Sequence, residues 1–188
     1  IEGSVCYLSH AATSRSLLWH FVPHPVPSMQ LCLFEDAHVP ALRPLVESRA
    51  AYDLRLGGRT ILETLRDALS PAGLVLHARP LVAEMTRRTH PSAAVNTLPE
   101  GADVLFVNGR FVAAAGDARA QLMRAPQRDE ARAYVQGDTL VAAWVPGAAD
   151  VLPADVLDAP TFPEDAVSPL PKTELDEASL VGRPWDLL

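Results

Sequence analysis

Short apolar runs alternate with helix-forming segments along this chain, and this alternation constrains its fold more than any other feature. The apolar runs 30–34, 74–77 and 103–107 have the length and composition of buried strands. Segments with a helical period or with helix-capping residues lie between them. This order predicts an α/β domain, built on a mostly parallel (mixed) sheet with helices on both faces.

The first helix is predicted by a capping box. The Thr60 hydroxyl can accept a hydrogen bond from the amide of Glu63, while the Glu63 carboxylate reaches back to the amide of Thr60. Pro71 and Gly73 end the helix. Between these signals, one face of the helix carries an apolar stripe made of Ile61, Leu62, Leu65, Ala68 and Leu69.

Two more helices and two hairpins are expected. Pro80 starts a helix over 81–88, and Asp117 caps a short helix that ends at Met123. Asn108-Gly109 predicts a turn, and the apolar residues on either side favour a type I′ hairpin. A second pair of strands, 131–135 and 139–145, is expected to be joined across residues 136–138.

The length of 188 residues, with 48% of them hydrophobic, suits one domain with its own core. Met29 opens the first strand abruptly, so we expect residues 1–28 to be an unstructured or non-native extension and 29–188 to be the domain. The alternative is an ordinary flexible arm. Near the C-terminus the sequence predicts an exposed apolar patch that additional chain would cover. Its residues are Val181, Trp185, Leu187 and Leu188.

Composition argues against several classes of protein. The net charge is -7 and Lys and Arg do not cluster, which argues against nucleic-acid binding. No apolar run reaches the roughly 18 residues of a membrane span. The two cysteines, Cys6 and Cys32, have no paired spacing, so neither a disulfide framework nor a zinc site is indicated. A reducing, cytoplasmic location fits these observations.

Two segments are candidate ligand sites. Glu35-Asp36 follows the first strand, and parallel sheets bind ligands at the carboxyl ends of their strands. The alternative is a solvated acidic loop. Gly57-Gly58-Arg59 precedes a helix N-terminus, where free amides favour an anion. The alternative there is a tight turn in front of the capping box.

The order of several short motifs resembles the sugar nucleotidyltransferase superfamily. The motifs are Pro44-Leu45-Val46, then Leu54, then Gly58-Arg59-Thr60-Ile61-Leu62-Glu63, and later Val104-Leu105-Phe106-Val107-Asn108-Gly109. The resemblance implies a nucleotide-diphospho-sugar transferase-like fold. In that superfamily the first motifs lie close to the phosphates of the nucleotide.

The chain resembles one divergent branch of this superfamily more closely. That branch is similar to the N-terminal domain of the bifunctional UDP-N-acetylglucosamine diphosphorylase/glucosamine-1-phosphate N-acetyltransferase. The matching motifs are Phe34-Glu35-Asp36, Pro44-Leu45 with Arg49, Arg55-Leu56-Gly57, Phe106-Val107-Asn108-Gly109 and Pro184-Trp185-Asp186-Leu187. This resemblance implies that a left-handed β-helix acyltransferase domain follows the present chain. It also implies a bacterial role in cell-envelope biosynthesis and a homotrimer formed through that further domain.

The chain departs from the superfamily at three positions. The glycine-rich phosphate loop falls on residues 35–41, which contain no glycine. The phosphate-binding lysine falls on Ala51, and the metal-binding aspartate falls on Arg110. Arginines remain available, and their planar forks suit phosphate oxygens.

The resemblance implies a sugar nucleotidyltransferase that joins a nucleoside triphosphate and a sugar 1-phosphate. It assigns catalytic roles to Arg49 and Arg55 and places Mg²⁺ at Asp36. Substrate contacts are expected from Asp36, Arg43, Gly57, Gly58, Arg59, Asn108, Gly109 and Arg110. We expect these regions to converge on one pocket. The alternative function is a non-catalytic binding or scaffold domain attached to a hexapeptide-repeat acyltransferase.

Overall fold

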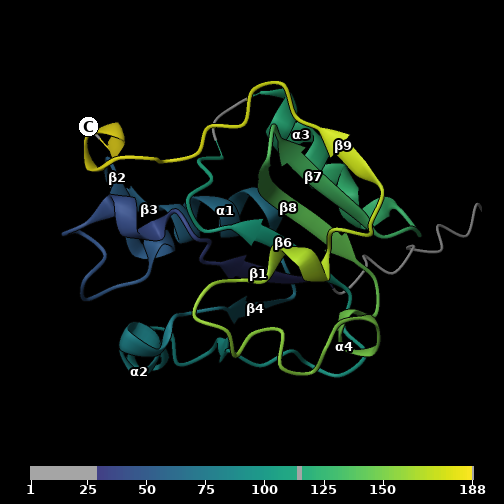
Figure 1. Cartoon of the computed structure of the whole chain (residues 1–188), viewed down its shortest axis with the longest axis horizontal. Coiled ribbons are helices and arrows are strands. Elements are labelled where there is room, and N and C mark those ends of the chain that lie inside the picture. Colours follow the sequence, from purple (N-terminus) through teal and green to yellow (C-terminus); the bar gives the residue numbers. More distant parts are fainter. Residues whose placement is uncertain (1–28, 114–115, 188) are drawn as a thin grey trace, which may run out of the picture.

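A seven-stranded sheet forms the centre of the computed structural model, which describes residues 29–113 and 116–187 (Figure 1). The strands lie in the order β5-β4-β1-β6-β8-β7-β9. Their bounds are β1 Gln30–Phe34, β4 Gly73–Leu76, β5 Ala94–Val95, β6 Val104–Asn108, β7 Arg132–Gln136, β8 Thr139–Val145 and β9 Lys172–Glu174. A separate two-stranded sheet pairs β2 Arg55–Leu56 with β3 Arg59–Thr60.

The first half of the sheet is parallel, as the sequence predicts. In β1, Leu33 lies between Leu76 of β4 and Val107 of β6, and both pairings are parallel. β8 then runs antiparallel to β6 and to β7, while β9 is parallel to β7. The carboxyl ends of β4, β1 and β6 therefore meet at one edge, which positions the residues that follow them.

Each face of the sheet has its own hydrophobic core, because strand residues alternate between the faces. Leu31 and Leu33 of β1 pack in one core, whereas Cys32 and Phe34 pack in the other. Helices contribute to the first core: α1 Ile61–Leu69, α2 Pro80–Thr89 and α3 Asp117–Arg124. The second core is closed by the short helix α4 Ala148–Val151 and by apolar side chains of residues 152–170.

The capping box is present as predicted. Thr60 Oγ1 accepts from the amide of Glu63 at 3.1 Å, and Glu63 Oε2 accepts from the amide of Thr60 at 2.8 Å. Ile61, Leu62 and Leu65 are the buried residues of the helix that follows. The helix ends at Leu69, and its C-cap Ser70 adopts a left-handed conformation in front of Pro71.

Two local predictions are wrong. Asn108-Gly109 forms a turn but not a type I′ hairpin, since a type I′ turn needs positive φ at both residues and neither has it. The chain instead continues from this turn to Phe111, which pairs with Leu180. In α3, Gly116 is the N-cap and Asp117 is the first helical residue.

The last segment of the chain crosses the sheet rather than leaving it. After β9 it returns beside residues 110–112, where the Val112 amide donates to the carbonyl of Ser179 and the Val181 amide donates to the carbonyl of Arg110 (Figure 1). Val181 is buried in the first core, so its predicted place in an exposed apolar patch is wrong, whereas Trp185 is 66% exposed. No helix in the described part of the chain is long and apolar enough to span a membrane.

Candidate functional site

Buried polar side chains gather at the carboxyl edge of the parallel strands. The buried polar residues there are Glu35, Asp36, His77, Asn108 and Arg110, and each is at most 4% exposed. Burying a charge is costly unless it is paired and hydrogen-bonded. The partners of these groups therefore decide what the edge can do.

Asp36 is held in a buried ion pair with Arg110. Arg110 Nη2 lies 2.5 Å from Asp36 Oδ2, and its Nε donates to both carboxylate oxygens at 2.9 and 3.2 Å. Asn108 Nδ2 donates to Asp36 Oδ2 at 2.9 Å. Burial by itself raises the pKa of Asp36, but the bonds from Arg110 and Asn108 outweigh it and hold that pKa below its ordinary value.

Asn108 and Gly109 connect the end of β6 to the neighbouring strands by hydrogen bonds. Asn108 Nδ2 also donates to the carbonyl of Leu140, and the Gly109 amide donates to the carbonyl of Phe34 at 2.7 Å. A Cβ at Gly109 would lie 3.0 Å from Phe34 O and from the Tyr52 ring. Glycine is needed here for close approach of two strand ends.

Glu35 forms a second ion pair that points the other way, and its Arg79 partner is 19% exposed. Arg79 Nη1 lies 2.6 Å from Glu35 Oε1, which also accepts from the amide of Ala51 at 2.9 Å. The same guanidinium donates to the carbonyls of Val46 and Arg49. Arg79 thus fastens the segment 46–51 to the ends of β1 and β4.

His77 is a structural residue at this edge. Its Nδ1 accepts from the amide of Glu35 at 3.2 Å, so the proton is on Nε2, which donates to the carbonyl of Ala159 at 2.8 Å. Burial lowers the pKa of His77, in keeping with a neutral ring.

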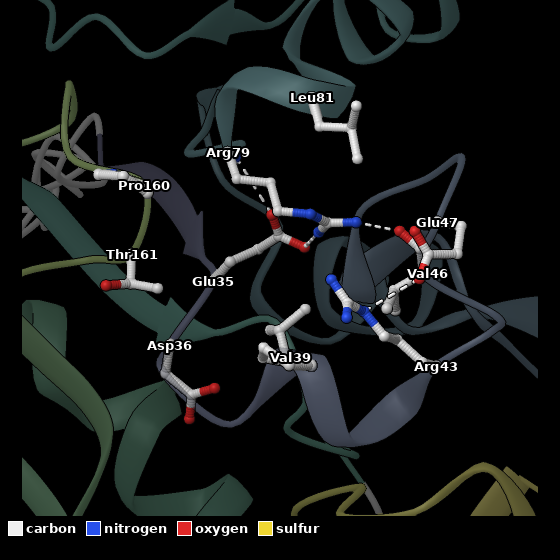
Figure 2. Close-up of a pocket in the computed structure, with 11 residues that line it drawn as sticks. Glu35, Asp36, Val39, Arg43, Val46, Glu47, Arg79, Leu81, Pro160 and Thr161 are labelled. Atoms are coloured by element: carbon white, nitrogen blue, oxygen red, sulfur yellow. Dashed lines mark hydrogen bonds and ion pairs between the residues drawn. The ribbon is translucent and has the colours of Figure 1, made fainter.

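A first cavity of about 200 Å³ opens at the carboxyl ends of β1 and β4. Figure 2 shows the Glu35–Arg79 pair along one side of it and Arg43 beside Glu47 on another. The Asp36 carboxylate points away from that pair. Leu81, Pro160 and Thr161 complete the walls.

A second, larger cavity of about 650 Å³ lies on the other side of the segment 46–49. Arg49 and Arg55 line it, together with residues of α1 and α2. Asp36 and Arg43 line the first cavity, while Asn108, Gly109 and Arg110 are buried and line neither. The structure therefore does not bring the predicted site residues together in one pocket.

The predicted anion site at Gly57-Gly58-Arg59 is a hairpin turn. Gly57 has a φ of +64°, and the two glycines connect β2 to β3. Arg59 pairs with Asp67 at 2.5 Å. The three residues are exposed, and none lines the two cavities described above.

The surroundings of Asp36 do not fit a metal ion. Both carboxylate oxygens already accept bonds from Arg110, and the side chain is fully buried. A guanidinium in this place would repel a divalent cation. Within residues 29–113 and 116–187, no group of three or more His, Cys, Asp or Glu side chains could hold one.

Sequence reasoning missed Arg79 and Arg66. Arg79 lies three residues after the end of β4 and directly before Pro80 at the start of α2, so the same carboxyl-edge argument that identified Glu35 would have found it. Arg66 lines the second cavity from the exposed side of α1. A solvent-facing arginine on a helix carries no comparable sequence signal.

Comparisons with known proteins agree with this architecture. The chain is similar in fold to a Bacillus anthracis protein assigned as a glucose-1-phosphate thymidylyltransferase and solved in complex with a sucrose. The TM-score is 0.52 at 9% identity, covering 85% of this chain and 92% of that one. No curated protein matches the sequence. The family model described as sugar nucleotidyl transferase matches residues 31–188. The chain therefore belongs to the sugar nucleotidyl transferase family.

Proposed function

We propose that this domain joins a nucleoside triphosphate to a sugar 1-phosphate and releases pyrophosphate. The observation that carries the proposal is the family match, which covers residues 31–188. The cavity at the carboxyl ends of β1 and β4 supports it, because open α/β sheets bind ligands in the crevice at that edge.

In the proposed reaction an oxygen of the sugar phosphate attacks the α-phosphorus of the nucleotide. A new P–O bond forms as the bond to the bridging oxygen breaks, and pyrophosphate leaves opposite the incoming oxygen with that electron pair. Transfer of this kind depends on positioning and on cationic groups that neutralise the phosphates. The protein's own cations must therefore lie where phosphate oxygens can reach them.

Arg43 is the residue of the first cavity best placed to make such a contact. Its side chain is 66% exposed, and its only ion pair in the described structure, to Glu47 at 2.9 Å, is also exposed. Exposed pairs are worth about 0–1 kcal/mol, so a phosphate can replace Glu47 at little cost. Arg79 is committed to Glu35 and to two carbonyls. We assign Asn108, Gly109 and Arg110 to holding the edge together rather than to ligand contact.

The motif order resembles that of UDP-N-acetylglucosamine diphosphorylases, so uridine triphosphate and N-acetylglucosamine 1-phosphate are the first substrates to test. The same resemblance leads us to propose a cytoplasmic, bacterial role in cell-envelope biosynthesis. It also leads us to propose that the domain works with a left-handed β-helix acyltransferase domain through which three copies associate.

One observation favours a second candidate function, binding without catalysis. Glu35 and Asp36 stand where the superfamily's glycine-rich loop should fall, and both are buried in ion pairs. Neither carboxylate can take a metal ion without breaking its pair. A domain with this edge would recognise a nucleotide or sugar phosphate and leave any chemistry to an attached domain.

A pyrophosphate-release assay on the full chain separates the two functions. A panel of nucleoside triphosphates and sugar 1-phosphates is tested with and without Mg²⁺. Release that requires both substrates, and that falls at least tenfold in Arg43→Ala, supports the transferase. Arg87→Ala is the matched control, because Arg87 is an exposed arginine that lines neither cavity. Binding of both substrates without release selects the second function, and absence of binding contradicts both.

A further inference from the structure

Donors from the protein use the full accepting capacity of the Asp36 carboxylate. Arg110 Nε donates to Oδ1 at 2.9 Å and to Oδ2 at 3.2 Å, and its Nη2 donates to Oδ2 at 2.5 Å. Asn108 Nδ2 donates to Oδ2 at 2.9 Å, and the amide of His38 donates to Oδ1 at 3.1 Å. A carboxylate offers about four lone-pair sites, so these contacts fill it. A metal ion could bind Asp36 only by displacing them.

The cation that pairs with Asp36 is itself fixed by further hydrogen bonds. Arg110 Nη1 donates to the carbonyl of Val181 at 2.8 Å, and the Val181 amide donates to the carbonyl of Arg110 at 2.9 Å. The Arg110 amide donates to Asn108 Oδ1 at 3.0 Å, and the residue is 4% exposed. An arginine in a protein is not deprotonated. The charge beside Asp36 is therefore permanent, whereas a bound metal ion can be removed by a chelator.

The other carboxylates that line the first cavity differ in what they could still bind. Glu35 is buried and paired with Arg79. Glu47 is 51% exposed, and its partner Arg43 is exposed as well. Mg²⁺ in proteins is held by as few as one or two carboxylates together with substrate phosphates. Glu47 is therefore the alternative metal ligand that an experiment must separate from Asp36.

We propose that the Arg110 guanidinium takes the place of the divalent cation that the family resemblance implied for Asp36, and that the domain binds its ligand in the metal-free form. The choice of a nucleoside triphosphate as that ligand rests on the proposed function, but the replacement of the metal ion does not. Phosphate oxygens then meet the arginine of the first cavity directly. Mg²⁺ bound to the nucleotide competes with Arg43 for the same oxygens, so it should not strengthen binding.

Thermal unfolding of the full chain with Mn²⁺ or with a chelator tests the replacement without any nucleotide. Arg110→Asp places a second carboxylate beside Asp36, and Arg110→Asn is the matched control of the same size without the charge. Saturating Mn²⁺ should raise the unfolding temperature of Arg110→Asp by about 5 °C or more, and it should shift the wild type and Arg110→Asn by less than about 1 °C. A wild-type shift as large as that of Arg110→Asp would overturn the inference, and so would a folded Arg110→Asp that Mn²⁺ does not stabilise.

Calorimetric titration of uridine triphosphate into the wild type tests the form of the ligand, and it does not depend on whether Arg110→Asp folds. The affinity in the presence of a chelator should equal or exceed the affinity in Mg²⁺. A gain of tenfold or more in Mg²⁺ would overturn the inference. Loss of that gain in Glu47→Gln would then identify Glu47 as the metal ligand.

Failure of this inference and failure of the proposed function give different results. Pyrophosphate release that requires Mg²⁺ supports the transferase and overturns the inference. Equal release with Mg²⁺ and with a chelator supports both. Absence of nucleotide binding under either condition contradicts the proposed function, while the comparison of Arg110→Asp with the wild type in Mn²⁺ still decides the inference.

Discussion

At the scale of single residues, the carboxyl edge is held by two acidic neighbours that pair in opposite directions. Glu35 pairs with Arg79 toward α2, and Asp36 pairs with Arg110 toward the end of the chain, where Arg110 Nη1 also donates to the carbonyl of Val181. Both carboxylates are at most 1% exposed. Breaking a buried pair leaves an uncompensated charge, which is why these contacts matter more than surface pairs.

Replacing Arg110 should destabilise the protein strongly. Arg110→Met leaves the Asp36 carboxylate buried without its cation, so we expect a loss of about 3–5 kcal/mol in the free energy of unfolding. The control, Arg43→Met, removes an exposed pair worth about 0–1 kcal/mol. Urea unfolding followed by circular dichroism measures both, and equal losses in the two variants would contradict a structural role for the Asp36–Arg110 pair.

At the scale of elements, the start of α1 is stabilised by hydrogen bonds within its own first turn. The capping box satisfies the amides of Thr60 and Glu63, and Thr64 Oγ1 donates back to the carbonyl of Thr60. This turn joins the β2–β3 hairpin to the helix that presents Arg66 to the second cavity. A frayed first turn would therefore loosen one wall of that cavity.

Removing the cap should have a moderate, local cost. Thr60→Ala loses the side-chain acceptor for the Glu63 amide, and loss of an N-cap typically costs about 1 kcal/mol. Thr64→Ala makes the same chemical change one turn later, where a threonine bonded to its own helix contributes little. Thermal unfolding of both variants is the measurement, and a Thr64→Ala loss as large as that of Thr60→Ala would argue against the cap.

At the scale of the whole molecule, the segment 159–162 packs against residues of β1 and β6 and against His77, which follows β4. The Phe162 amide donates to the carbonyl of Glu35 at 2.8 Å, and its ring centre lies 4.6 Å from that of Phe34 and 5.3 Å from that of Phe106. The carbonyl of Ala159 accepts from His77. Phe162 of this segment packs in the second core, and Pro160 and Thr161 of the same segment line the first cavity.

Phe162→Ala should therefore affect stability and the first cavity together. Loss of a buried phenylalanine typically costs about 3–5 kcal/mol. Val151→Ala is the control, because Val151 is 61% exposed and should change the unfolding free energy by no more than about 0.5 kcal/mol. Chemical unfolding gives both values. A Phe162→Ala loss near that of the control would show that the segment does not contribute to the core.

The sequence by itself determined the elements whose signals are local. The run 30–34 became β1, the capping box started α1, and 139–145 became β8, since each depends on residues within one element. The order of strands and helices also predicted the parallel half of the sheet. The edge at which Glu35 and Asp36 lie followed from the same reasoning.

Only the tertiary structure decided the partners of those residues. Asp36 bonds to Arg110, 74 positions away, and Glu35 bonds to Arg79, 44 positions away. No local pattern specifies such pairs, because the sheet order and the path of the last segment bring them together. The same long-range packing separates Arg49 and Arg55 from Asp36, as the segment 46–49, held by Arg79, lies between the two cavities.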